Sequence, residues 1–133
     1  MNNDKSFEAI LQKIASFNFS ETFDTIVAIA NGGIIPAALL NQRLQCDFQV
    51  IKISLRNPDQ RPMYDTPRLV EPLTFDPKGR RILLVEDRVK TGASLRFAKE
   101  LLVEAELLKT FSVNGNTDYS LFNEACFRFP WLI

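Results

Sequence analysis

Two acidic side chains followed by a turn of small residues are the most informative feature of this sequence. Glu86 and Asp87 end the apolar run Ile82–Val85, and the turn Lys90–Ser94 follows closely. Such a turn offers backbone N–H groups at a helix start, a glycine that permits close approach and two hydroxyl donors, which together can hold a phosphate. Carboxylates beside a phosphate can accept hydrogen bonds from sugar hydroxyls or hold Mg2+ through water. The pattern therefore predicts a site for a phosphorylated ligand that carries hydroxyl groups.

A second turn with glycines lies upstream. Asn31, Gly32 and Gly33 follow the apolar run Ile26–Ala30 and precede a helical pattern with Pro36 in its first turn. This order indicates a strand, a tight loop and a helix. Paired glycines before a helix by themselves usually indicate only a tight turn. Because ligands of open α/β sheets bind at the carboxyl ends of the strands, we expect this loop and the acidic turn to lie at the same edge.

The elements that must position these turns alternate between strand and helix. Apolar runs predict strands over about 26–30, 48–54, 68–73, 81–85 and 109–113, and helical spacing predicts helices over about 7–17, 36–44 and 95–105. The alternation predicts an α/β fold with a mainly parallel central sheet flanked by helices, in a single domain over residues 1–133. Residues 55–67 are polar and lack apolar periodicity, which is typical of a functional lid or a disordered loop.

The amino-acid composition excludes several functional classes for this chain. The 133 residues are 46% hydrophobic and 24% charged, the formal net charge is zero and there is no histidine. Catalytic Ser-His-Asp and Cys-His groups and histidine-ligated zinc are therefore excluded. Without a basic run or an apolar stretch near the roughly 18 residues of a membrane span, we expect no nucleic-acid or membrane partner. Cys46 and Cys126 lack CxxC spacing, so we expect reduced thiols in the core of a cytoplasmic protein.

Taken in this order, the two turns resemble the signature of the type I phosphoribosyltransferases. Val85–Ser94 is similar to the hydrophobic strand, acid pair and Thr-Gly-x-Ser turn of that family, and Ile26–Ala37 is similar to its pyrophosphate loop and the following helix. The polar loop over about 55–67, with Tyr64, falls where the family has a flexible lid. The aromatic end of the chain, about 116–133, looks like its small C-terminal hood. The resemblance is closest to the xanthine-guanine and hypoxanthine purine-salvage branch.

This resemblance implies a transferase that moves the 5-phosphoribosyl group from 5-phosphoribosyl 1-pyrophosphate (PRPP), bound with Mg2+, to a purine-like base and releases pyrophosphate. It implies catalytic roles for Glu86, Asp87 and Lys90, with the two acids on the ribose hydroxyls or on the metal through water. The further implied contacts are Lys90, Thr91, Gly92, Ala93 and Ser94 for the 5'-phosphate, Asn31, Gly32 and Gly33 for the pyrophosphate, and Asn114 and Phe127 for the base. It also implies a homo-oligomer, with a dimer expected.

Two alternatives stay open at this point. The string Ile82–Asp87 also resembles the start of response-regulator receiver domains, which place it at their N-terminus and lack a Thr-Gly-Ala-Ser turn behind it. The other alternative is a non-catalytic regulatory protein of the same fold that binds PRPP or a nucleotide. Asn31, Lys90 and Asn114 favour it, because purine-salvage members usually carry a basic residue, an acid and a nearby lysine at these places.

Overall fold

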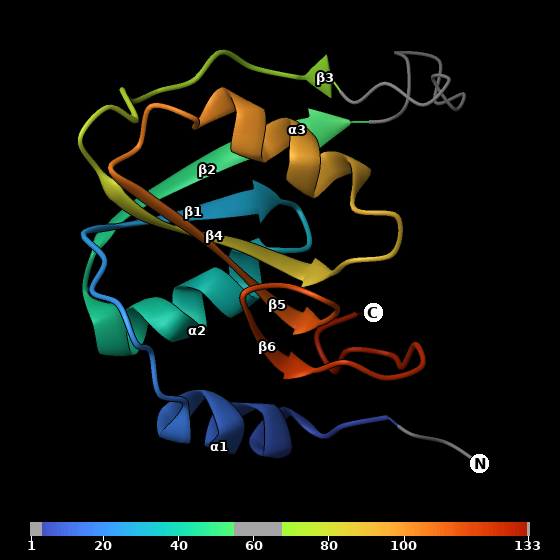
Figure 1. Cartoon of the computed structure of the whole chain (residues 1–133). Coiled ribbons are helices and arrows are strands. Elements are labelled where there is room, and N and C mark those ends of the chain that lie inside the picture. Colours follow the sequence, from blue (N-terminus) through green and yellow to red (C-terminus); the bar gives the residue numbers. More distant parts are fainter. Residues whose placement is uncertain (1–3, 55–67, 133) are drawn as a thin grey trace.

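The chain folds around one six-stranded sheet (Figure 1). The computed structural model describes residues 4–54 and 68–132. Its elements are α1 (Phe7–Ser16), β1 (Thr25–Ala30), α2 (Ile34–Leu44), β2 (Asp47–Ser54), β3 (Arg68–Leu69), β4 (Arg81–Arg88), α3 (Ala93–Leu101), β5 (Leu107–Asn114) and β6 (Tyr119–Phe122). The strands lie in the order β3-β2-β1-β4-β5-β6, and only the β2–β3 pair is antiparallel. The predicted α/β fold with a mainly parallel sheet is confirmed.

Helices cover both faces of this sheet. In β1, Ile26 and Ala28 belong to a core with residues of α1 and α2, whereas Val27 and Ile29 belong to a second core with residues of α3. Figure 1 shows the same division, with α1 and α2 on one side of the sheet and α3 on the other. Successive side chains of a strand point to opposite faces, so a strand that is apolar throughout needs cover on both.

Two of the predicted elements are shorter in the structure. Strand β3 contains only Arg68–Leu69 of the expected 68–73. Helix α3 ends at Leu101, because Leu102 has φ −107° and ψ 18°, outside regular helix geometry. Ala105 still packs on the second core from the loop beyond the helix. The apolar spacing thus identified the buried side chains correctly and misplaced the helix end.

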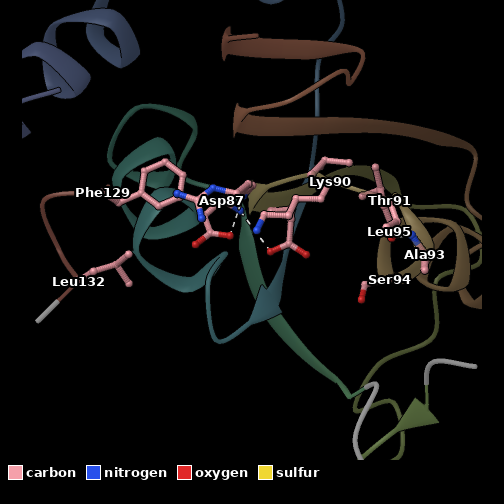
Figure 2. A pocket seen from close by; sticks show the side chains of 12 residues that line it. Asp87, Lys90, Thr91, Ala93, Ser94, Leu95, Phe129 and Leu132 are labelled. Atoms are coloured by element: carbon pink, nitrogen blue, oxygen red, sulfur yellow. Dashed lines mark hydrogen bonds between the residues drawn. The ribbon is translucent and has the colours of Figure 1, made fainter. Parts of the chain in front are cut away.

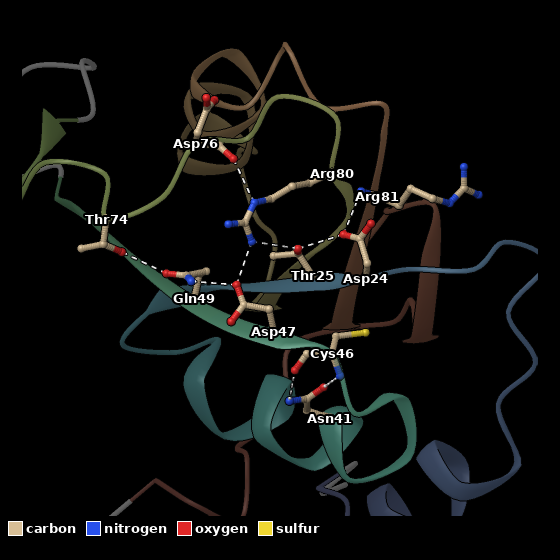
Figure 3. A network of polar contacts seen from close by, with 10 residues as sticks. All are labelled: Asp24, Thr25, Asn41, Cys46, Asp47, Gln49, Thr74, Asp76, Arg80 and Arg81. Carbon is tan, nitrogen blue, oxygen red and sulfur yellow. Dashed lines mark hydrogen bonds and ion pairs between the residues drawn. The ribbon is translucent and has the colours of Figure 1, made fainter.

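A polar network joins the strands at the edge where β1, β2 and β4 begin (Figure 3). Arg80 Nη1 donates to Asp47 Oδ2 at 2.7 Å and to Thr25 Oγ1 at 3.1 Å. Asp24 Oδ1 accepts from the backbone N–H of Arg81 at 3.0 Å. These contacts fix the amino ends of the strands, and the glycine and acidic turns follow their carboxyl ends. The network therefore holds the scaffold of the site without being part of it.

The two cysteines are free thiols. Cys46 is partly buried, and its Sγ donates to the carbonyl of Phe23 at 3.2 Å. Cys126 is exposed in the C-terminal segment. The expectation that both lie in the core is therefore wrong for Cys126, because the chain beyond β6 runs over the surface before Phe127 turns inward.

Candidate active site

The glycine loop and the acidic turn meet at one edge of the sheet. Strands β1 and β4 are parallel neighbours, and β4 continues beyond the predicted 81–85 as far as Arg88, so its last residues, which include both acids, lie next to the loop that follows Ala30. A Cβ placed on Gly32 would lie 2.5 Å from Asp87 Oδ1, which means that only a glycine leaves room for this carboxylate. The structure thus brings together residues predicted from two separate motifs.

Gly33 fixes the loop to the sheet. Its N–H donates to the carbonyl of Ile29 at 2.8 Å, and a Cβ on Gly33 would lie 2.3 Å from the carbonyl oxygen of Val85. The peptide bond between Ala30 and Asn31, at the start of the loop, is cis. Helix α2 begins directly after Gly33, so this close approach sets where the helix starts.

Replacing Gly33 with alanine is expected to lower the free energy of unfolding by about 1–3 kcal/mol, because the added methyl overlaps backbone oxygens of two strands. Gly33 has φ −81°, which any residue can adopt, so the change isolates the steric contact. Urea unfolding followed by circular dichroism measures the effect, with the exposed substitution Ala38→Ser in α2 as control. Equal unfolding midpoints for Gly33→Ala and the unchanged chain would contradict the close approach.

The turn after β4 forms the start of α3. Gly92 is its N-cap residue with φ +80°, in the left-handed region that favours glycine. Glycine has no side chain to cap the helix, so N–H groups of the first turn stay available to a ligand. Thr91 Oγ1 lies 3.3 Å from the N–H of Ala93, and Arg96 Nη1 donates to the carbonyl of Thr91 at 3.0 Å. The arrangement suits an anion at the positive end of the helix dipole.

A cavity of about 510 Å³ connects the acids with this turn. Its lining consists of Glu86–Leu95, Phe129 and Leu132. Figure 2 shows Thr91 on one side of Asp87, and Phe129 and Leu132 on the other. The cavity therefore has an end rich in N–H and hydroxyl donors and an apolar end, with the acids between them. Its volume is in the range of small-molecule sites.

The two acids interact with each other. Burial, and then the negative charge of Asp87, raise the pKa of Glu86 to about 8. Asp87 Oδ1 accepts from the backbone N–H of Arg88 at 2.6 Å, and Glu86 Oε1 accepts from that of Asp87 at 3.2 Å. Glu86 therefore retains a proton at neutral pH until a cation or a hydroxyl donor next to it favours the carboxylate.

Two of the predicted base contacts are engaged elsewhere. Asn114 is buried, its Nδ2 donates to the carbonyl of Glu124 at 3.2 Å, and its Oδ1 accepts from the N–H of Glu124 at 3.0 Å. Phe127 is 3% exposed and packs edge-on against Phe122 and Phe129. Neither Asn114 nor Phe127 is among the described residues that line the cavity. Their roles in binding a base stay predictions, and these contacts do not support them.

The remaining predicted residues lie in different surroundings. Lys90 lines the cavity and is exposed. Asn31 is also exposed, and its carbonyl accepts from the N–H of Ile34 at 3.1 Å. Tyr64 and the predicted lid over 55–67 lie outside the described residues.

Sequence reasoning missed five residues that line the cavity: Arg88, Val89, Leu95, Phe129 and Leu132. Arg88 carried a usable signal, because it directly follows the two acids at the end of β4. Phe129 shares its residue type and its alternation with Phe127, so the sequence offered no means of choosing between the two rings.

A mainly parallel sheet brings an acid pair and a glycine loop together at the carboxyl ends of its strands, and the acids share a cavity with an uncapped helix start. This arrangement is typical of proteins that bind phosphorylated ligands. The agreement extends to sequence. This chain belongs to the phosphoribosyl transferase domain family, whose model matches residues 2–113. The resemblance stated from the two motifs is confirmed.

Individual relatives agree with this assignment. A xanthine-guanine phosphoribosyltransferase of Idiomarina loihiensis is 24% identical over 119 residues, which cover 84% of this chain and 73% of the relative. Another, of Chromohalobacter salexigens, is 36% identical over 93 residues, which cover 68% of this chain and only 53% of the relative. The crystal structure of a purine phosphoribosyltransferase from Pyrococcus horikoshii matches with a TM-score of 0.80 at 23% identity, over 98% of this chain and 93% of that chain. The predicted type I fold and the likeness to the purine-salvage branch are confirmed.

Proposed function

We propose that this chain transfers the 5-phosphoribosyl group from PRPP to a purine-like base and releases pyrophosphate. The observation that carries the proposal is the meeting of the two motifs, with Asp87 against Gly32 and the uncapped start of α3 on the same cavity. Relatives named for purine bases support this class of acceptor. The comparisons do not favour the alternative of a non-catalytic regulatory protein, which rests on the residue types at Asn31, Lys90 and Asn114.

The proposed roles follow the order of groups along the cavity. Thr91, Gly92, Ala93 and Ser94 in the cavity lining hold the 5'-phosphate. The loop of Asn31, Gly32 and Gly33, which follows the neighbouring strand and is not part of that lining, holds the pyrophosphate. The ribose then lies over Glu86 and Asp87, which accept hydrogen bonds from its hydroxyls. Pyrophosphate leaves with the electron pair of the C–O bond, a nitrogen of the base supplies the pair of the new C–N bond, and the proton that the base loses passes to water. Two carboxylates next to the electron-poor ribose carbon stabilise its positive charge.

The acid pair also suits Mg2+. Among the described residues there is no group of three or more His, Cys, Asp or Glu side chains placed to hold a metal ion. Mg2+ often takes only one or two carboxylates, together with water and substrate phosphates. We therefore propose that Glu86 and Asp87 hold the ion through water. When bound, Mg2+ neutralises charge on the departing pyrophosphate.

Lys90 is proposed to assist at the phosphate end. It is exposed at the margin of the cavity, next to the turn that starts α3. A protonated ammonium donates hydrogen bonds and does not accept protons, so its proposed work is to balance the charge of the 5'-phosphate.

The family resemblance also supports proposals on location, assembly and domain organisation. We propose that the protein is a cytoplasmic homodimer. We also propose a lid over about 55–67 that carries Tyr64, and a hood over about 116–133. Within the part of the chain that the structure describes, no helix has the length and apolarity needed to cross a bilayer. The proposed partners are PRPP, a base and a second copy of the chain.

Calorimetric titration with PRPP, with and without Mg2+, tests the proposal. We expect Mg2+-dependent binding in the micromolar range, which corresponds to about −8 kcal/mol. Ribose 5-phosphate, which lacks the pyrophosphate, is the control ligand and should bind more weakly and without need of the metal. Release of pyrophosphate on adding a purine base then shows transfer. Absence of PRPP binding at millimolar concentration would overturn the proposal, and binding without release with any base would favour the regulatory alternative.

A further inference from the structure

The apolar end of the cavity is built as a stack of three side chains. Trp131 lies on Phe129 with 5.1 Å between the ring centroids and 10° between the planes. The guanidinium carbon of Arg88 lies 4.8 Å from the centroid of the same Phe129 ring. Trp131 and the guanidinium of Arg88 therefore both pack against the Phe129 ring. Phe129 is 1% exposed and has no free face for a bound base.

Two members of this stack have a buried N–H without a hydrogen-bond partner, Trp131 at Nε1 and Arg88 at Nε, and of these two only Arg88 lines the cavity. One of its terminal nitrogens donates to the carbonyl of Phe127, while its Nε is buried and has no hydrogen-bond partner. The ion pairs within residues 4–54 and 68–132 do not include Arg88. A buried donor without an acceptor costs about 1–3 kcal/mol, and such groups often mark a place that a ligand completes.

Arg88 lies at the end of the cavity where the acceptor base is expected. The start of α3 and Phe129 lie on opposite sides of Asp87 in the cavity (Figure 2). With the 5'-phosphate at α3 and the ribose over the acids, a base attached to the ribose extends toward Phe129, Leu132 and Arg88. The group that meets the base there is the planar guanidinium, whose cation both stacks on rings and donates to oxygen atoms.

We propose that Arg88 selects the acceptor and that the acceptor is a planar heterocycle with a negative charge at neutral pH. The inference rests on the proposed function and deepens it. An anionic ring supplies the charge that Arg88 lacks among the described residues and an oxygen or nitrogen acceptor for its free N–H. The guanidinium cation attracts a negative charge, and this attraction is stronger in a partly buried site than in water, so a neutral ring of the same size gains less from the same contact.

Matched pairs of bases test this proposal. Initial rates of pyrophosphate release are measured with urate against hypoxanthine and with orotate against uracil, at fixed PRPP and Mg2+. We expect kcat/KM to favour the anionic member by about tenfold or more, which corresponds to about 1.4 kcal/mol. Arg88→Met should remove this preference by lowering the rate with the anion, and Arg88→Lys should retain part of it because the charge remains. Arg128→Met, which changes an exposed arginine outside the cavity lining, is the matched control.

The same variants separate this inference from the proposed function. Unchanged PRPP affinity in Arg88→Met, together with loss of the preference, supports a role at the base alone. Two results would overturn the role of Arg88 even if the chain transfers the phosphoribosyl group. One is an equal rate with the anionic and the neutral base of a pair, and the other is a preference for the anion that persists in Arg88→Met. If the unchanged chain binds PRPP without transfer, calorimetric binding of urate and hypoxanthine in the presence of ribose 5-phosphate decides the same point. Failure of PRPP to bind at all would count against the proposed function instead.

Discussion

Replacing Glu86 with glutamine is expected to raise the free energy of unfolding at pH 9 by several kcal/mol and to leave it nearly unchanged below pH 4. Burial and the charge of Asp87 raise the pKa of Glu86 to about 8, above the ordinary value of 4.5. A group whose pKa is raised by folding favours the folded state least at high pH, because the carboxylate must then be buried without its proton. The penalty grows between about pH 4.5 and 8 and is complete above that range.

Glutamine keeps the shape of this side chain and removes its charge, so the penalty should vanish with it. Urea unfolding at a series of pH values measures the difference between the two chains. Glu100→Gln, which changes an exposed acid of α3, is the control and should follow the unchanged chain at every pH. Parallel stability curves for Glu86→Gln and the unchanged chain would show that Glu86 ionises as it does in water.

Asp87→Asn is expected to weaken Mg2+-dependent binding of PRPP by about 100-fold, or about 2.7 kcal/mol. The amide has nearly the same shape, so its oxygen can keep the bond to the N–H of Arg88 and its contact with Gly32. What is lost is the charge that holds the metal and the ribose hydroxyls. The melting temperature should therefore stay nearly the same, because the hydrogen bond to Arg88 and the contact with Gly32 are kept.

Calorimetric titration of the Asp87→Asn variant with PRPP and Mg2+ provides the measurement. Asp76→Asn is the matched control, because Asp76 belongs to the polar network at the opposite edge of the sheet (Figure 3). Equal dissociation constants for Asp87→Asn and the unchanged chain would place the donor elsewhere. A large fall in melting temperature would instead give Asp87 a structural role.

The sequence was sufficient to predict the carboxyl edge of the sheet. The apolar runs of β1 and β4 are uninterrupted. Burial decreases at the carboxyl end of each strand, and the polar residues of the two motifs begin there. Because the strands are parallel, the two turns were expected at the same edge of the sheet, and the structure adds that β1 and β4 are neighbours, which places Gly32 beside Asp87. Local pattern and fold rules agree here, and for this reason the prediction was reliable.

The apolar end of the cavity could not be predicted in the same way. The path of the C-terminal segment depends on contacts between distant residues, such as Asn114 with Glu124 and Lys5 with Glu124, and no local pattern encodes them. These contacts decide that Phe129 and not Phe127 reaches the cavity. Asn114 was assigned to the base from its position alone, whereas its amide joins β5 to this segment.

Because Trp131 packs in the stack with Phe129 and Arg88, its intrinsic fluorescence is expected to respond to ligands at the apolar end of the cavity. The sequence contains one tryptophan, and it is the member of the stack that is not among the residues lining the cavity. A molecule that displaces or polarises the guanidinium alters the ring on which the indole rests, so intrinsic fluorescence reports occupancy of that end without a label. Molecules confined to the phosphate end leave the emission unchanged. The spectrum of a single residue can thus distinguish which half of a ligand has bound.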